Sequence, residues 1–459
     1  MTGQQLRLTV EQVLALASDE ASRTAGGKLG GEGSWTLTGD SASGAVWGLC
    51  KGSGREPYRT VVDLTGPAYR CTCPSRKFPC KHALGLLLLR ATREAQEARE
   101  GREAREGQEP APPPDWAAEW LAERAAKAAR AADGPARPAD AEAARKRAAR
   151  RAERVGAGVL ELERRLADAV REGLAGQERT GYAGWEETAA RMVDAQAPGL
   201  AARVRELGAI PGCGAGWPAR MLEEFALLHL LDRAWLGVSG LPEPLAATVR
   251  SRVGLPYSAE GETVRDRWLV LAQYDSVSPD GRLTTRRTWL RGLGSGRPAL
   301  VLDFGPPGRP PELALPVGLV LEAPVRFRTG SAGLRADLGD RTATTAATGA
   351  PAAVSTGEAL AAYGAALRED PWLESWPVVL GPVIPVPGEA GEGGWQIADA
   401  EGTSALPVTP AGGRSRTGLW QLAALSGGGP VTVFGECGHR GFTPLTAWHP
   451  HAAEPVVLG

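Results

Sequence analysis

The hydrophobic pattern of residues 1–92 predicts a small α/β domain. It opens with a short segment, Thr9–Ser18, whose apolar side chains favour one side of a helix. Strand-like runs separated by glycine-rich turns follow, and the region closes with the strongly apolar run Leu84–Leu89, which predicts a buried helix. The runs are Ser34–Thr38, Ala45–Leu49, Tyr58–Leu64 and Tyr69–Cys73.

Residues 93–114 are predicted to be a linker. They repeat Arg, Glu, Ala and Gly without a large apolar residue, and they end in prolines at positions 110 and 112–114. We expect a mobile tether that trypsin cuts first, at Arg99, Arg102 or Arg105. Such a cut would release an N-terminal fragment that stays folded by itself.

Residues 115–237 are predicted to be helical. Asp115 follows the prolines as a candidate N-cap, and Trp116 and Trp120 lie one turn apart. Two apolar stripes with helical spacing indicate a small antiparallel bundle. The stripes are Val159, Leu162, Leu166, Val170 and Leu174, and then Met221, Leu222, Phe225 and Leu228.

Residues 255–459 are predicted to be mostly strand and turn, with one helix over Gly357–Leu367. The apolar runs lie between clusters of glycine and proline. They include Trp268–Ala272, Thr284–Leu290, Ala299–Phe304 and Val431–Phe434. The chain is therefore expected to be a multidomain α+β protein with a small N-terminal α/β module, a helical bundle and a C-terminal antiparallel β-rich region.

Composition narrows the range of functions. The formal net charge of −1 argues against a protein that coats nucleic acid through one large basic field, although a local basic patch remains compatible with it. The N-terminus lacks the pattern of a signal peptide, and no apolar run is long enough to span a bilayer. We expect a soluble, cytoplasmic protein, in which closely spaced cysteines more often bind metal than form disulfides.

One motif carries recognisable chemistry. Cys71 and Cys73 form a Cys-x-Cys pair, and Cys80 and His82 form a Cys-x-His pair six residues later. Three thiolates and one imidazole complete the tetrahedral shell of a structural zinc site, which leaves no open position for a reacting water. Basic neighbours would favour the deprotonated sulfurs. They are Arg70, Arg76, Lys77 and Lys81.

This Cys-x-Cys…Cys-x-His motif, between a strand and an apolar helix, resembles the SWIM zinc finger. The sequences of residues 73–89 and of the upstream segment Cys50–Tyr58 are similar to those of bacterial SWIM zinc finger family proteins. The resemblance implies Zn²⁺ at the four positions and a binding role, with DNA and protein contacts both proposed for such modules. It also implies a possible partner, an AAA-type ATPase of the MoxR class.

Two functions remain open. We favour a non-catalytic protein–protein adaptor, because the net charge is near zero and no catalytic motif is present. The alternative is nucleic-acid binding through the basic residues of the motif and a basic helix over residues 140–154. That helix carries Arg145, Lys146, Arg147, Arg150, Arg151 and Arg154.

A second metal site is a further hypothesis. Cys437 and His439, and His449 and His451, both have the alternate spacing that places two side chains on one face of a strand. Against a site, glycines and Pro450 mark turns here. Of the remaining candidates, His229 is expected to be buried on an apolar helix face, Cys50 to be buried as a small hydrophobe, and Cys213 to lie in a loop.

Overall fold

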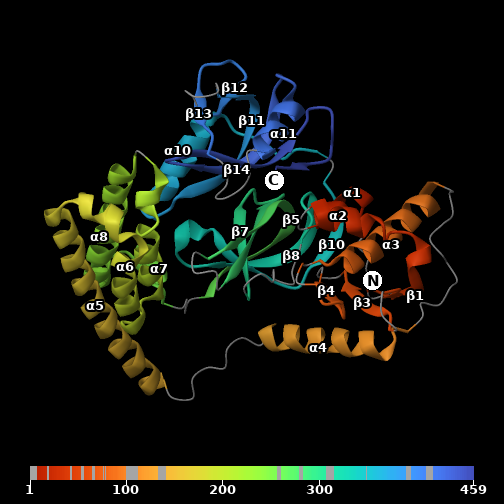
Figure 1. Cartoon of the computed structure of the whole chain (residues 1–459), viewed down its shortest axis with the longest axis horizontal. Coiled ribbons are helices and arrows are strands. Elements are labelled where there is room, and N and C mark those ends of the chain that lie inside the picture. The colour runs from red at the N-terminus through yellow and green to blue at the C-terminus, as the bar shows by residue number, and fades with distance from the viewer. Residues whose placement is uncertain are drawn as a thin grey trace.

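The computed structural model shows an α+β protein with several domains, as predicted (Figure 1). A β-rich part lies at the centre, with a helical bundle on the left, the N-terminal domain on the right and a C-terminal sheet above. The structure describes residues 8–17, 20–41, 44–52, 56–64, 68–75, 77, 79–99, 112–132, 141–214, 216–255, 260–278, 283–306, 315–347, 349–388, 394–409 and 417–458.

The N-terminal domain is an antiparallel four-stranded sheet in the order β1-β2-β3-β4, covered by helices. Its first helix starts where a capping box forms, because the side chain of Thr9 accepts from the backbone of Gln12 and that of Gln12 accepts in return. The elements are α1 (Val10–Ala15), α2 (Glu20–Gly27), β1 (Trp35–Asp40), β2 (Ala45–Cys50), β3 (Tyr58–Asp63), β4 (Ala68–Cys71) and α3 (Lys81–Arg99). All four predicted strands and the two predicted helices, α1 and α3, are confirmed, whereas α2 was not predicted.

Helix α3 is the centre of this domain. Residues 83–89 are buried all the way round it, as expected for a helix enclosed on every side. A Cβ at Gly85 would lie 2.5 Å from the Cβ of Leu29, so this glycine permits the close approach of the segment after α2. The helix continues to Arg99, seven residues into the predicted linker, and residues 100–111 of that linker lie outside the described residues.

Helix α4 (Asp115–Ala132) packs on the sheet of the N-terminal domain, on the side where Trp47 is buried. Trp120 and Ala117 of α4 share a buried cluster with Trp47 and Val61 of the sheet. Arg124 of α4 also donates to the Asp63 carboxylate at 3.0 Å. The sequence grouped α4 with the helices that follow it, but its packing joins it to the zinc-binding domain.

The helical bundle follows residue 140. Its elements are α5 (Ala141–Glu172), α6 (Gln177–Asp194), α7 (Pro198–Leu207), α8 (Trp217–Leu236) and α9 (Glu243–Val253), with 3₁₀ turns at Leu174–Gly176, Ile210–Cys213 and Val238–Gly240. One cluster of buried side chains, including Val159, Leu162, Trp185 and Phe225, fills the space between these helices. The predicted bundle is confirmed, and it extends through α9, beyond the predicted end at residue 237.

The central β-rich part is a closed barrel. β5 pairs with β6 and β8, β6 with β7, and β9 with both β8 and β7, so the strand order around the barrel is β5-β6-β7-β9-β8-β5. The closing pair β7–β9 is parallel and the other pairs are antiparallel. The strands are β5 (Glu260–Val277), β6 (Thr284–Gly292), β7 (Pro298–Gly305), β8 (Leu319–Arg328), β9 (Arg335–Leu338) and β10 (Thr342–Ala346), which extends the sheet beside β8.

The C-terminal part is a second sheet in the order β13-β12-β11-β14-β15-β16. Helix α10 (Thr356–Leu367) confirms the predicted helix, whereas α11 (Thr417–Ser426) is a second helix that the sequence analysis missed. The strands are β11 (Ser375–Val386), β12 (Gln396–Asp399), β13 (Ala405–Pro407), β14 (Val431–Gly438), β15 (Gly441–Trp448) and β16 (Val456–Val457).

The barrel packs against the domains around it. Trp268, Val270 and Leu321 of the barrel lie in one continuous buried cluster with Leu84 and Leu87 of α3. On two other strands of the barrel, β6 and β7, Trp289 and Leu300 are buried against Phe434 and Trp448 of the C-terminal sheet. The zinc-binding domain is therefore built onto the barrel. None of the described helices combines the length and the apolar character needed to cross a bilayer.

Candidate metal centre

Four ligand side chains come from two ends of one strand–turn–helix unit. Cys71 is the last residue of β4, Cys73 follows in the turn, Cys80 directly precedes α3, and His82 lies in the first turn of α3. Cys80 and His82 are buried, and Cys71 and Cys73 are half-buried. Two ligands therefore come from the end of β4 and the turn after it, and two come from the start of α3. All four lie near the same point.

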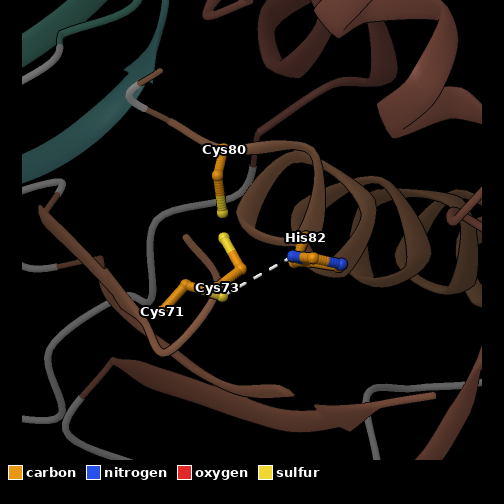
Figure 2. A group of neighbouring side chains, drawn as sticks. All are labelled: Cys71, Cys73, Cys80 and His82. Carbon is orange, nitrogen blue, oxygen red and sulfur yellow. Dashed lines mark hydrogen bonds between the residues drawn. The ribbon is translucent and has the colours of Figure 1, made fainter. Parts of the chain in front are cut away.

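The four ligand atoms all lie within 4.8 Å of one another, and Figure 2 shows the sulfurs and a ring nitrogen converging on a common centre. The Nδ1 atom of His82 lies 3.6 Å from the Cys71 sulfur. In a zinc tetrahedron, bonds of about 2.0–2.3 Å place neighbouring donor atoms roughly 3.5–3.8 Å apart. The donor set and its spacing thus fit Zn²⁺ with small shifts of side chains.

The thiols strongly affect one another's protonation. Hydrogen bonds from Cys71 and Cys80 lower the pKa of Cys73, while hydrogen bonds with the other two sulfurs raise the pKa of Cys80. The Cys73 thiolate is thus stabilised, whereas the neighbouring sulfurs are held in the protonated form. A divalent cation at the centre would stabilise all three thiolates together, which is the chemistry that zinc supplies to such a set.

Two further side chains hold the ligands in place, and sequence reasoning missed both. The hydroxyl of Thr60 lies 3.3 Å from the Cys71 sulfur, and the ring of Tyr58 contacts that of His82 at a centroid distance of 4.7 Å and an interplanar angle of 35°. Both come from β3, which pairs with β4. Only the strand register, in which Thr60 lies opposite Cys71, could have identified the threonine.

The basic residues around the motif are exposed. Lys77 and Lys81 point into solvent, and Arg70 approaches Glu123 of α4 at 3.7 Å. Arg76 lies outside the described residues. In Figure 1 β4 and α3, which hold the motif, lie right of centre, whereas α5, which carries the other basic run, lies at the far left. The two basic groups therefore do not form one continuous track.

The hypothesis of a second metal site does not hold. Cys437 is buried on β14, and His439, in the β14–β15 turn, contacts Tyr363 and Glu223. His449 and His451 follow the far end of β15, whose eight residues span roughly 27 Å at about 3.4 Å per residue. Among the described residues, the grouping of at least three metal-ligating side chains is the one around Cys71.

Three single-residue expectations have different outcomes. Cys50 is fully buried, and Cys213 is exposed in a 3₁₀ turn, as expected. His229 was expected in the core but is exposed, with a ring nitrogen 2.8 Å from the Glu163 carboxylate. It lies one position C-terminal to Leu228, which faces the core of the bundle.

Comparison with protein families agrees with this geometry. Residues 58–91 match the SWIM zinc finger. The chain contains a SWIM zinc finger. A second match, over residues 150–253, is to the SWIM-associated four-helix bundle domain, which corresponds to the bundle from the first third of α5 to the end of α9. The chain matches no curated protein and no solved structure. The SWIM zinc finger spans β3, β4 and most of α3, so it contains all four ligand positions.

Proposed function

We propose that this protein is a non-catalytic protein–protein adaptor in which the SWIM zinc finger has a structural role. The structural role follows from the enclosure of the finger: α3 covers one side of its sheet, α4 covers the other, and α3 shares its core with the barrel. Four protein ligands fill a tetrahedral zinc site, so the metal stabilises this arrangement and takes no part in a reaction.

A pair of tryptophans gives the adaptor a candidate docking surface, and this observation carries the proposal. Trp420 of α11 is 59% exposed, and its ring meets that of Trp395 edge-on at a centroid distance of 4.9 Å. Val386, at the end of β11, is also exposed. Exposed tryptophans are rare on monomers and are enriched at the centres of protein interfaces.

The experiment compares Trp420→Ala with a matched control in the full chain. Leu360→Ala removes another exposed apolar side chain from α10, a helix of the same C-terminal part. Purified AAA-type ATPase of the MoxR class is the first protein to test, because the resemblance to SWIM proteins implies it. We expect Trp420→Ala to weaken binding at least tenfold, about 1.4 kcal/mol, and Leu360→Ala to have little effect. Equal affinities for the wild type and Trp420→Ala would reject this surface.

Nucleic-acid binding is a second candidate, and the first half of α5 favours it. Arg145, Lys146, Arg147, Arg150 and Arg154 are exposed there, in a segment that begins nine residues before the matched bundle. Some of this charge is engaged, because Lys146 pairs with Glu142 and Arg154 donates to Gln196. Binding of duplex DNA that weakens steeply with salt, and is lost in Arg147→Glu/Arg150→Glu, would support this candidate over the adaptor.

A further inference from the structure

The strand order of the barrel matches that of a fold that binds ligands on a defined surface. Numbered from β5, its strands follow the Greek-key order 1-2-3-5-4-1, with a parallel pair between the third strand, β7, and the fifth, β9. The long first strand, β5, pairs with the second through its C-terminal half and with the fourth through its N-terminal half. This is the arrangement of the OB-fold, whose second and third strands present a surface for oligonucleotides or oligosaccharides.

The outer face of β6 and β7 is only partly covered here. Trp289 and Leu300 are buried against the C-terminal sheet. Two and four residues further along the same face, towards the β5–β6 loop, Arg287 lies opposite Leu302 and Thr285 lies opposite Phe304. Leu302 is half-buried and packs against the covering cluster, whereas the Phe304 side chain is 54% exposed, so the cover ends between these two positions.

The open part combines an aromatic ring with a cation. Arg287 lies between Tyr274 and Leu302 in the strand register, diagonal to Phe304, and no described residue forms a hydrogen bond or ion pair with its guanidinium. Glu436 of β14 contacts this face and accepts from Tyr274, Trp289 and Ser375. The Glu436 carboxylate is therefore already held by three hydrogen-bond donors, and the Arg287 guanidinium remains available to bind an anion.

We propose that this face, formed by Phe304 and Arg287 with Thr285 and Leu302, binds single-stranded nucleic acid. A base would stack on the Phe304 ring, and the Arg287 guanidinium would contact the adjacent phosphate. Such pairs of stacking and phosphate contacts hold single strands on barrels of this type without reading their sequence. The inference goes beyond the adaptor role and does not depend on it.

The test uses the full chain and a fluorescently labelled oligo-dT of 20 nucleotides, with binding followed by anisotropy. Phe304→Ala should weaken binding about 5- to 100-fold, since loss of one stacked base reduces affinity by that order. Phe304→Tyr should retain most of the affinity, and Arg287→Ala should weaken binding and reduce its salt dependence. Leu293→Ala, which removes an exposed apolar side chain from the β6–β7 turn of the same barrel, is the matched control.

Three results would overturn the proposal. The first is equal affinity of the wild type and Phe304→Ala for oligo-dT, and the second is an equal loss of affinity in Phe304→Ala and Leu293→Ala. The third is that duplex DNA binds more tightly than oligo-dT and that Arg147→Glu/Arg150→Glu abolishes the duplex binding. The last result would assign nucleic-acid binding to α5 alone. Because Phe304 is more than half exposed, the variants should melt as the wild type does, and circular dichroism would verify this.

Discussion

The hydroxyl of Thr60 lies 3.3 Å from the sulfur of Cys71, directly across the β3–β4 ladder. Thr60 is fully buried, so water does not compete for this contact. The sheet thereby fixes one zinc ligand through a side chain outside the motif, in the way that residues beyond the ligands commonly orient metal sites.

Replacing Thr60 by Val should weaken zinc binding about 10- to 100-fold, because the Cys71 sulfur loses its fixed partner while the size of the side chain is kept. Competition with a coloured zinc chelator would measure the change. Thr72→Val is the control, because Thr72 is exposed and its hydroxyl accepts from the Arg59 backbone. Equal zinc affinity of the wild type and Thr60→Val would show that the contact has no role.

Purified protein should contain about one zinc per chain, and the double variant Cys80→Ala/His82→Ala should lose it. Metal analysis by mass spectrometry would check both. Since α3 shares its core with the barrel, zinc removal should also destabilise the barrel, seen as a change in Trp268 and Trp289 fluorescence on adding a chelator. A double variant that still holds a full equivalent of zinc would contradict the site.

Limited trypsin digestion should cut the predicted linker without separating its two sides. The N-terminal domain and the barrel share one buried cluster, so the fragments should elute together from a gel-filtration column. This replaces the expectation from sequence of a fragment that folds independently. Fragments that elute apart would restore the independent module, whereas first cuts within residues 141–253 would show that the linker itself is protected.

Replacing Asp232 by Asn should stabilise the protein above about pH 5. Asp232 is fully buried in α8, and burial, followed by the charge of Glu163, raises its pKa to about 9. Between the unfolded pKa near 4 and pH 9 the folded state binds a proton that the unfolded state releases, so the free energy of unfolding falls as pH rises.

We expect the Asn variant to gain on the order of 1–3 kcal/mol at pH 8 and much less at pH 4.5, measured by urea unfolding at both values. The control is Asp194→Asn, at an exposed position in α6 of the same bundle. It should change the free energy of unfolding at neither pH. The same gain at both pH values would show that the effect does not come from ionisation.

The elements of the fold were largely predictable, because they depend on local patterns. The capping box at Thr9, the strand runs and the Cys-x-Cys…Cys-x-His spacing all act within a few residues. Assigning the faces of helices was less successful. Val170 and Leu222 were placed in apolar stripes but are exposed, whereas their neighbours Ala169 and Met221 are buried. A shift of one residue rotates a helix position by about 100°, and leucine is too common in these helices to mark the stripe.

Long-range packing could not be read from the sequence. Trp120 packs against sheet residues that lie more than fifty positions earlier in the sequence. The predicted linker separates its helix from that sheet. Likewise, Thr60 becomes a neighbour of Cys71 only through strand register. The helix α11 was missed because its sequence, TGLWQLAALS, is apolar on most sides and lies between glycine-rich stretches of the sequence.

The shared core of α3 and the barrel also sets an order for biosynthesis. Ala91 and Trp268 belong to the same buried cluster, yet 177 residues separate them in the chain (268 − 91). At about 5–20 residues per second, a ribosome needs roughly 10–35 s to make that segment. During this interval the apolar side of α3 has no barrel to cover it. Early zinc capture would keep the nascent domain ordered until its partner strands emerge, and cells short of zinc should accumulate aggregated nascent chains.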